Sequence, residues 1–490
     1  MWNKTICSAA EAMQILYDTT HSFGISESVI LEHAAIACTI EIKKRIKDKQ
    51  SLAIFYSCDQ HYNCGLALAR CLYQEGYAIH LILIHPEKKS PYEIEQWNIL
   101  KHFPISIHTS PDSIPEASGI IVCSPNLSPI WNDFIQASHA YIISLNIPAG
   151  ADETTGQITE HTLHSDLVIS LDCYKYGQWI EPARSTYKDI VCVNIGIPQT
   201  LHKTHTIFLN QEYIRAHLPK RTNQSHKGSF KKALMIGGSS TMHGAITMAA
   251  KACYSSGIGT LTLAIPQCIS TLVAYECEFA MNLLAEDTNG FFSTESIEYI
   301  KEQISSFDLI SVGNGMGRNE TTKEIVKNCL LSNKLILIDA DGLWALQDNL
   351  SLLNRNQTTI LTPHIKEMCY LCHKEVQEII KNPFETVRTF TQQYPHCILV
   401  LKSDITWIST NTQSFMLSKS NSALAKGGSG DILCGIIMGL LGQTSPTNAV
   451  VCATYIHNLC AQLTKKDPAA VLPQDLIDTI SDSFKILRKS

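Results

Sequence analysis

The sequence predicts an α/β protein made of two parallel-sheet domains. Two series of short apolar β-type runs alternate along its 490 residues with segments long enough for helical crossovers. The polar, basic stretch NQEYIRAHLPKRTNQSHKGSF separates the two series. Such a composition is typical of a linker, so we expect one domain in residues 1–214 and a second in residues 215–490.

Composition argues against several classes of function. The chain has 39 Lys and Arg against 45 Asp and Glu, a net charge of −6, and it lacks the long basic run that a phosphate backbone would require. The apolar segments predict neither a signal peptide nor a membrane span. The 18 cysteines are scattered through apolar segments, which indicates reduced core residues. We therefore expect a cytoplasmic protein that binds neither nucleic acid nor a membrane.

The first series begins with a helical segment. Apolar spacing predicts an amphipathic helix from about Ala9 to Arg45. The strands expected after it are SLAIFYS, AIHLILIH, GIIVCS, AYIISLNIP and DLVISLD. The connections between these runs are long enough for the crossovers of a parallel sheet.

The second series consists of apolar runs that mostly end in Gly, Asp or His. These runs are KKALMIGG, GTLTLAIP, FDLISVGNG, KLILIDAD, TTILTPH, CILVLKS and ITWIST. In open α/β sheets the carboxyl ends of the strands hold the ligand crevice. We therefore expect the polar and glycine residues that follow these strands to share one functional edge.

Two glycine-rich turns and a pair of acids follow strands of this series. Residues 237–245 (GGSSTMHGA) and 313–318 (GNGMGR) carry little side-chain bulk, so a ligand could approach the backbone, although such glycines also occur in ordinary turns. Asp339 and Asp341 end the strand in IDADGL. A carboxylate there is suited to Mg²⁺ or to capping the next helix, and the sequence leaves both roles open.

Two further strand ends carry a histidine and a lysine. His364 in TPHIKEM follows a proline and faces the same edge, where it is either structural or a ligand contact. Lys402 opens the polar part of LKSDITW, which is suited to the rim of a nucleotide site. The spacing Cys369-Tyr-Leu-Cys372-His373 resembles haem attachment or half of a metal site, but we interpret it as the start of an amphipathic helix.

The stretch ALAKGGSGDILCG places a glycine-rich turn directly before an apolar helix. Asp431, in the first turn of that helix, is a candidate general base that takes a proton from a substrate hydroxyl. The alternative is an acid that stabilises the helix by about 0.3–1 kcal/mol. A candidate anion hole for a developing phosphate charge is formed by the amides of Gly427, Gly428, Ser429 and Gly430.

The motifs of the second half, taken in order, resemble a known family. The resemblance is to the bifunctional NAD(P)H-hydrate repair enzymes, and it rests on HKG (residues 226–228), GGSSTMHGA, GNGMGR, IDADGL, TPHIKEM, LKSDITW and AKGGSGDILCG. It implies that this half is a ribokinase-like dehydratase, which uses ADP or ATP to convert the hydrated cofactor (6S)-NAD(P)HX to NAD(P)H. The resemblance covers nearly the whole chain.

The same resemblance implies roles for individual residues. Asp431 would act in catalysis by deprotonating the C6 hydroxyl, so that a phosphoryl group can be transferred to it and then eliminated. Mg²⁺ would be required, and the enzyme would be a homo-oligomer. The binding site for the substrates NADHX and NADPHX would be lined by Ala245, Gly315, Gly317, His364 and Asp431. The adenine nucleotide would be held by Lys402, Ser403, Asp404, Ile405, Thr406 and Gly430.

The first half resembles the epimerase domain of the same family. The resemblance rests on ISESVILEHAA, GLALARCL, SLNIPAG, YKYG and NIGIP, and it implies a Rossmann-like three-layer fold that precedes the ribokinase-like domain. It also implies a K⁺ cofactor for this domain. The candidate residues of the epimerase-like site are Asn63, Asn146 and Lys175.

Several chemical groups of that site are replaced in this chain. SCDQHYNCG (residues 57–65) stands in place of a glycine-rich loop, and it cannot present its amides to a phosphate as glycines do. Asn146 stands where the family has an acid, and an amide cannot shuttle a proton at pH 7. A carboxylate ligand for K⁺ is missing as well. We therefore expect weak or no epimerase activity, although Lys175 could still bind an anion.

Alternatives remain open for each half. The second half could be another ribokinase-like kinase, which phosphorylates a vitamin-precursor alcohol, because such kinases share the glycine-rich turn before the aspartate. The first half could be a binding or scaffolding module without catalysis. The run GIIMGLLGQ (residues 435–443) is suited to a subunit interface and to the core alike.

Overall fold

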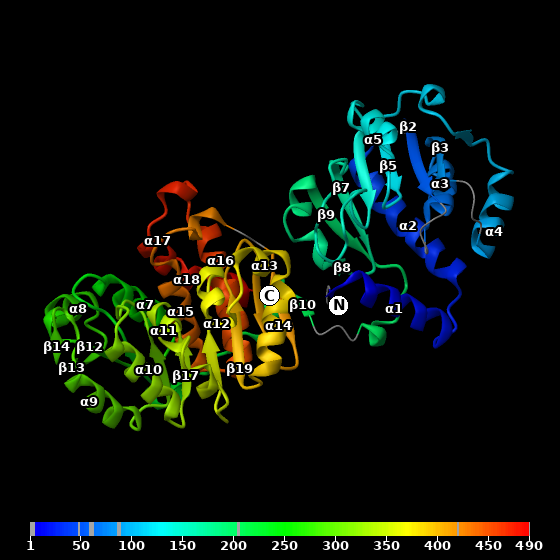
Figure 1. The fold of residues 1–490 in the computed structure, drawn as a ribbon. Helices are drawn as coiled ribbons and strands as arrows, with labels where there is room; N and C mark the ends of the chain where they lie inside the picture. The colour runs from blue at the N-terminus through cyan, green and yellow to red at the C-terminus, as the bar shows by residue number, and fades with distance from the viewer. Residues whose placement is uncertain are drawn as a thin grey trace. The chain divides into compact units, whose positions relative to one another are not determined.

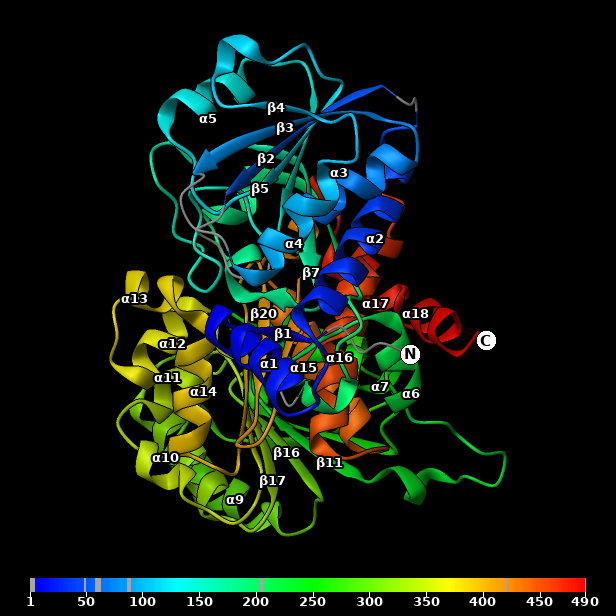
Figure 2. The same cartoon turned by 90° about the vertical axis from the view of Figure 1, so that its right-hand side faces the viewer.

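The computed structural model describes residues 5–47, 50–57, 63–85, 90–202, 206–418 and 421–489. The chain forms two compact units, Met1–Ile207 and Phe208–Ser490 (Figures 1 and 2). The division therefore falls a few residues before the junction expected near residue 215. The polar stretch that suggested the junction contains helix α6 (Gln211–His217) and a 3₁₀ turn at Lys227–Phe230.

The first unit is built on a seven-stranded sheet. Its order is β4-β3-β2-β5-β6-β7-β9, and every neighbouring pair is parallel. Apolar clusters cover both faces, as expected for strands buried on two sides. The strands are β2 (Ser51–Ser57), β3 (Ala78–His85), β4 (Ser106–His108), β5 (Gly119–Cys123), β6 (Tyr141–Leu145), β7 (Ser165–Leu171) and β9 (Tyr187–Val193).

Helices on both faces complete the three layers predicted for this unit (Figure 2). One face is covered by α2 and α3 (Gly65–Gln74), with α4 (Pro91–Leu100) beside α3, and the other face by α5 (Pro129–Gln136). The single helix expected from Ala9 to Arg45 is two helices, α1 (Ala9–His21) and α2 (Glu27–Arg45).

The break between α1 and α2 has a local cause. Gly24 adopts φ +72°, a conformation that favours glycine, and Ser26 then caps α2 by accepting a hydrogen bond from the amide of Val29. A short parallel pair, β1 (Ile6–Cys7) with β8 (Tyr174–Lys175), brings the start of the chain beside Lys175. This pair was not expected, because two-residue strands leave no periodic pattern in the sequence.

The second unit contains the other large sheet, in the order β21-β20-β19-β18-β17-β16-β11-β12-β13. Its neighbours are parallel from β13 to β19 and antiparallel from β19 to β21. The strands are β11 (Lys232–Ile236), β12 (Thr260–Pro266), β13 (Met281–Ala285), β16 (Leu309–Val312), β17 (Leu335–Ile338), β18 (Thr359–Leu361), β19 (Cys397–Leu401), β20 (Thr406–Ser409) and β21 (Ser414–Leu417).

The antiparallel end of this sheet differs from the prediction of an all-parallel sheet. Residues 402–405 are the whole connection between β19 and β20, and so few residues can close a hairpin but cannot hold a crossover. Three short strands complete the inventory. They are β10 (Thr206–Phe208), where the two units meet along the chain, and the small hairpin of β14 (Asp287–Thr288) and β15 (Phe291–Phe292).

Helices lie on both sides of the second sheet (Figure 2). One side has α9 (Glu295–Ile304), α10 (Glu320–Leu331), α11 (Asp341–Leu346), α12 (Ile365–Cys372), α13 (Val376–Lys381) and α14 (Pro383–Gln393). The other side has α7 (His243–Ser255), α15 (Ser429–Leu441), α16 (Pro446–Leu463) and α18 (Ile480–Arg488). The short helices α8 (Ser270–Glu276) and α17 (Pro473–Asp478) both contact α7. No helix among the described residues combines the length and apolarity needed to cross a membrane.

Two sequence motifs acquire a structural assignment here. Cys369 and Cys372 lie in the last turn of α12, and His373 ends it with φ +52°, so this segment is the end of a helix and not its start. Among the described residues, no three His, Cys, Asp or Glu side chains form a potential metal site. The run 435–443 is core: α15 is buried from Ile432 to Leu441 between α7 and α16.

Close packing of α15 on α7 depends on two glycines. A Cβ at Gly435 would overlap the carbonyl oxygen of Ala249, and one at Gly439 would overlap the carbonyl of Cys253. Both obstacles are backbone atoms, which cannot rotate away. The spacing of the two helices, and with it the position of the first turn of α15, is therefore set by these glycines.

We expect Gly435→Ala to lower the free energy of unfolding by about 1–3 kcal/mol, because the new methyl group forces α15 away from α7. Gly244→Ala in the same helix pair is the control, since a Cβ there meets only the end of Met248 at 3.9 Å. Urea denaturation of the full chain measures both variants. An unchanged midpoint for Gly435→Ala would show that the helices do not rely on this contact.

Candidate active site

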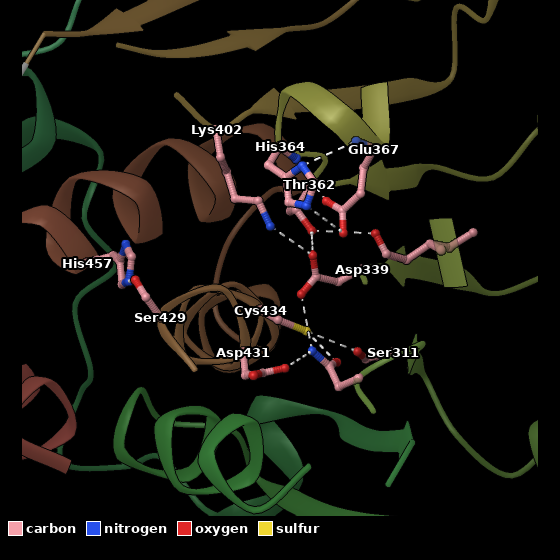
Figure 3. A network of polar contacts seen from close by, with 12 residues as sticks. Ser311, Asp339, Thr362, His364, Glu367, Lys402, Ser429, Asp431, Cys434 and His457 are labelled. Carbon is pink, nitrogen blue, oxygen red and sulfur yellow. Dashed lines mark hydrogen bonds and ion pairs between the residues drawn. The ribbon is translucent and has the colours of Figure 1, made fainter. Parts of the chain in front are cut away.

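The carboxyl ends of four neighbouring parallel strands supply the polar residues predicted to share an edge. β16 is followed by the turn at residues 313–318, β17 by Asp339, β18 by residues 362–364 and β19 by Lys402. The N-terminus of α15 lies at the same place, as Figure 3 shows. The sheet therefore brings together segments that are up to about 120 residues apart in the chain.

Asp431 is the third residue of α15. Gly428 caps the helix with φ +91°, and the first helical bond runs from the amide of Ile432 to the carbonyl of Gly428 at 3.1 Å. The amides of Gly430 and Asp431 therefore face outward from the first turn without an intrahelical acceptor. They carry the partial positive charge of the helix N-terminus, which favours an anion.

The anion hole predicted from four consecutive amides needs one correction. The amide of Ser429 points back into the loop and donates to the carbonyl of Lys426 at 3.3 Å. Lys426 is itself fixed, because its Nζ donates to the carbonyls of Ala469 (2.6 Å) and Val471 (2.8 Å). The turn is thus fixed through Lys426, and the amide of Ser429 is not available to an anion.

The carboxylate of Asp431 is held by Asn314. Its Oδ1 accepts a hydrogen bond from Asn314 Nδ2 at 2.7 Å. Burial and the nearby charge of Asp339 raise the pKa of Asp431 to about 7, although Asn314 and Lys402 act in the opposite direction. A carboxylate with this pKa is a far stronger base than an exposed one, and it changes protonation state near neutral pH.

Asp339 is the anchor of the site, and it is 2% exposed. Its Oδ1 accepts from Thr362 Oγ1 at 2.7 Å and from Lys402 Nζ at 3.1 Å, and its Oδ2 accepts from Asn314 Nδ2 at 3.1 Å. Burial alone would lower the pKa of Lys402, but Asp339 and Glu367 raise it above its ordinary value. Lys402 is therefore a fixed cation at the end of β19.

Asp341 has a different role from Asp339, although the same two alternatives, a Mg²⁺ ligand or a helix cap, were left open for both. Its Oδ2 accepts from the amide of Gly317 at 2.9 Å, and its Oδ1 pairs with Arg318 Nε at 3.4 Å. These contacts hold the GNGMGR turn against the start of α11. The side chains of Asp339 and Asp341 thus accept hydrogen bonds or form ion pairs with residues of neighbouring segments.

His364 is the N-cap of α12. Its Nδ1 accepts from the amide of Glu367 at 3.2 Å, and the Glu367 carboxylate accepts from the His364 amide at 2.9 Å. Burial and the charge of Lys402 lower the pKa of His364, so the ring is neutral at pH 7. The structural role that the sequence left open is therefore present. The side chain is 51% exposed, although its Nε2 lies 3.5 Å from Glu367 Oε1, so a ligand can reach part of the ring.

The predicted nucleotide segment, Lys402 to Thr406, forms the turn between β19 and β20. Asp404 is exposed at its tip and Ile405 is buried. A Cβ at Gly430 would lie 3.3 Å from Lys402 Nζ, so this turn and the glycine-rich turn of α15 meet directly. Among the residues that the family resemblance assigns to the substrate, a Cβ at Gly315 would lie 3.0 Å from the Cβ of Ala245. Most of the predicted residues of this half therefore surround one place.

Several residues whose contacts stabilise this site were not predicted from the sequence. Asn314 lies between glycines that were interpreted as a turn where a ligand could approach the backbone. Glu367 follows His364 at the spacing of a capping box, which was the available signal for it. His457 lies inside the apolar helix α16 and carried no signal. Its Nε2 contacts Ser429 Oγ at 3.1 Å, and burial lowers its pKa to about 4, so it is neutral.

In the first unit, Asn63 is a structural residue. Its Nδ2 donates to the carbonyls of Ser57 (3.0 Å) and Cys123 (2.6 Å), and its Oδ1 accepts from the amide of Gly65 at the start of α3. Residues 58–62 of the predicted loop lie outside the described residues. Asn63 thus ties β2 and β5 to α3 with every polar atom of its amide engaged.

Lys175 and Asn146 lie together at a cavity of about 250 Å³ in the first unit. Lys175 is 3% exposed, and its Nζ donates to Asn146 Oδ1 (3.1 Å) and to the carbonyls of Leu171 (2.8 Å) and Cys173 (3.0 Å). An ammonium group has three hydrogens, so none remains for an anionic ligand, contrary to expectation. Asn146 Oδ1 also accepts from the amide of Leu171 at 3.0 Å, and the adjacent Lys175 ammonium repels a second cation, so these residues do not fit K⁺.

Comparisons with known proteins cover both units. Residues 233–482 match the family described as NAD(P)H-hydrate dehydratase, and residues 27–177 match the YjeF-related protein N-terminus. The bifunctional NAD(P)H-hydrate repair enzyme Nnr of Moorella thermoacetica is 26% identical over 96% of this chain and 95% of its own length. The Nnr enzyme of Helicobacter pylori is 27% identical over 93% of this chain and 95% of its own.

Solved structures resemble the second half. The ADP/ATP-dependent NAD(P)H-hydrate dehydratase from Bacillus subtilis, co-crystallized with ATP/Mg²⁺, is 27% identical with a TM-score of 0.50. The match covers 57% of this chain and 98% of that one. A ribokinase-like superfamily protein from Enterococcus faecalis, 24% identical with a TM-score of 0.51, shares the fold.

Burial of Asp431 has a cost that depends on pH. Because its pKa is about 7 in the folded chain and about 3.9 when unfolded, the folded state loses stability as the pH rises through this window, by up to about 4 kcal/mol. We therefore expect Asp431→Asn to unfold at a higher temperature than the unmodified protein at pH 8, with the difference shrinking towards pH 5. Thermal unfolding across pH measures it, with the exposed Asp404→Asn as control. A difference that does not change with pH would contradict the raised pKa.

Proposed function

Because this chain belongs to the NAD(P)H-hydrate dehydratase family, we propose that residues 215–490 convert (6S)-NADHX and (6S)-NADPHX to NADH and NADPH with ADP or ATP as phosphoryl donor. The observation that carries this proposal is the position of Asp431: a carboxylate with a pKa of about 7, in the first turn of α15, next to two outward-facing amides. A base and an anion site at one helix N-terminus are what transfer of a phosphoryl group to an alcohol requires.

The residues of the site divide the work of the reaction. Lys402 and the amides of Gly430 and Asp431 bind the phosphate chain and spread the charge of the transferring group. Asp431 takes the proton of the C6 hydroxyl, whose oxygen attacks the terminal phosphorus of ADP or ATP and displaces AMP or ADP. The ring nitrogen then expels phosphate from C6, and loss of a proton from C5 restores the dihydropyridine. Ala245, Gly315, Gly317 and His364 line the nicotinamide side.

Mg²⁺ is proposed to enter with the nucleotide. The described residues offer no cluster of three His, Cys, Asp or Glu side chains for a resident metal ion. Mg²⁺ commonly binds through substrate phosphates and water with few protein ligands. A site with few protein ligands therefore fits Mg²⁺ that is bound as a metal–nucleotide complex. Bound in that form, Mg²⁺ would neutralise phosphate charge. We also propose that the protein is a homo-oligomer, as the family resemblance implies, and that it is cytoplasmic, as expected from its sequence.

For residues 1–214 we propose an epimerase-like domain with weak or no epimerase activity. Asn146 supplies an amide oxygen to Lys175 where the family resemblance implies an acid, and an amide does not transfer protons at pH 7. Glu153, whose pKa is raised by burial, lines the same cavity and is the carboxylate that could act instead. The fold and its cavity are thus retained without the expected acid.

Restoration of NADH absorbance from NADHX by the full chain, with ADP and ATP compared, tests the dehydratase. We expect Asp431→Asn to lower kcat about 10²–10⁴-fold, because the general base is lost while the bond to Asn314 is kept. Binding of ADP, measured by calorimetry, should persist. Asp482→Asn on exposed α18 is the control. Turnover of the Asp431→Asn chain at the unmodified rate would refute the assignment.

The full chain carrying Asp431→Asn also tests the first unit, because it cannot consume the product. We expect (6R)-NADHX to convert to (6S)-NADHX no faster than in buffer, followed by chromatography of the two epimers. An active epimerase from another organism serves as the positive control. Rapid conversion would overturn the proposal, and its loss in a further Glu153→Gln variant would then identify Glu153 as the acid.

A further inference from the structure

Asn314 donates hydrogen bonds to both acids of the dehydratase site, Asp339 and Asp431, which are labelled in Figure 3. It is 1% exposed. One hydrogen of its Nδ2 goes to Asp431 Oδ1 (2.7 Å) and the other to Asp339 Oδ2 (3.1 Å). A side-chain amide has two such hydrogens, so its whole donor capacity bridges the two carboxylates.

The backbone of Asn314 cannot shift to relieve this arrangement. Gly313 and Gly315 on either side have φ +127° and +68°, which side-chain-bearing residues rarely adopt. The carbonyl of Asn314 accepts from the amide of Gly238 at 2.8 Å. Its Cα position is therefore set by the turn after β16 and by the turn after β11 together.

The amide is also fixed about its own axis, by Cys434. The Cys434 thiol lies on α15, one turn after Asp431, and donates to Asn314 Oδ1 at 3.2 Å. Burial raises the pKa of this thiol well above its ordinary value, so it stays protonated. Ser311 Oγ contacts the same sulfur at 3.2 Å. A flipped amide would turn its oxygen towards two carboxylates and its hydrogens towards a protonated thiol, which is unfavourable on both sides.

We propose that Asn314 is a positioning residue of the dehydratase reaction, which holds the Asp431 carboxylate in place for proton transfer, and that Cys434 keeps the Asn314 amide in the required orientation. This inference rests on the proposed role of Asp431 as base. Asn314 and Cys434 act through Asp431 and need not touch the substrate.

The charges around Asp431 explain why a neutral bridge is needed there. The ionised groups that act on Asp431 are Asp339 and Asp341, which repel its charge, and Lys402, which attracts it. Lys402 bonds to Asp339 and not to Asp431. The Asn314 bond therefore supports the ionised form of Asp431 without a direct ion pair, which would make the carboxylate too weak a base.

The first experiment reads the position of Asp431 without substrate. The pH at which Asp431→Asn changes stability reports the titration of Asp431, and it is measured in the unmodified chain and again with Asn314→Ala. We expect the midpoint to move upward from about 7 by at least half a pH unit, about a threefold change in proton affinity. Asn132→Ala, which removes a buried asparagine from α5, is the matched control and should leave the midpoint unchanged.

The second experiment follows dehydration of NADHX against pH. With Asn314→Ala we expect kcat at pH 7 to fall about tenfold, the acidic limb of kcat/KM to move upward, and activity to recover in part at higher pH. Cys434→Ser, which keeps a donor, should retain the unmodified profile, and Cys434→Ala should shift it in the same direction as Asn314→Ala. Cys329→Ala, a buried thiol of α10, controls for the cavity.

These outcomes separate the inference from the function on which it rests. A chain without dehydratase activity refutes the proposed function, while the substrate-free titration still reads the Asn314 bond. An active chain whose titration and pH profile are unmoved by Asn314→Ala refutes the positioning role, even if kcat is lower. If Asn314→Ala does not fold, the Cys434→Ser and Cys434→Ala pair decides, and identical profiles for the two would refute it.

Discussion

The second unit depends on one constraint: two carboxylates, Asp339 and Asp431, lie close together in a partly desolvated place, and the charge of Lys402 acts on both although it bonds only to Asp339. The lysine is bonded to Asp339, which also accepts from Thr362 and Asn314 and has no oxygen left unbonded. Asp431 receives a single bond from Asn314 among these side chains. This unequal division leaves Asp339 fully bonded and makes Asp431 a base that titrates near neutral pH.

The arrangement of strands and helices in the second unit produces this difference between Asp339 and Asp431. Because β16 to β19 are parallel neighbours, residues that are distant in sequence meet at one edge of the sheet. Asp431 reaches the same edge from the first turn of α15. The first turn of α15 reaches this edge because Gly435 and Gly439 allow the helix to lie directly on α7. A buried, charged Asp431 costs stability, and the apolar packing of α15 offsets that cost at the helix where it arises.

The sequence predicted the strands, their shared edge and the glycine-rich turn before Asp431, because these features follow from local periodicity and composition. It did not predict Asn314, since an asparagine between glycines has the composition of an ordinary turn. Its role depends on which way the amide points from the turn after β16 towards the end of β17 and helix α15, and no local pattern encodes that direction. The break at Gly24, the hairpin of β19 and β20, and the inward amide of Ser429 were missed for a related reason: each depends on backbone conformation at one or two residues.

The two units show what an asparagine amide does in opposite surroundings. In the first unit Asn146 accepts through its oxygen from the Lys175 ammonium, whose other hydrogens go to backbone carbonyls, so the cation is fully satisfied and has no reason to release or accept a proton. In the second unit Asn314 donates through its nitrogen to an acid that is otherwise poorly compensated. An amide that accepts from a lysine offers no proton-transfer group of its own, whereas one that donates to a carboxylate supports an acid that is ionisable near pH 7. The chemistry of this chain therefore follows from the partner that each amide faces, and it favours the second unit as the place of catalysis.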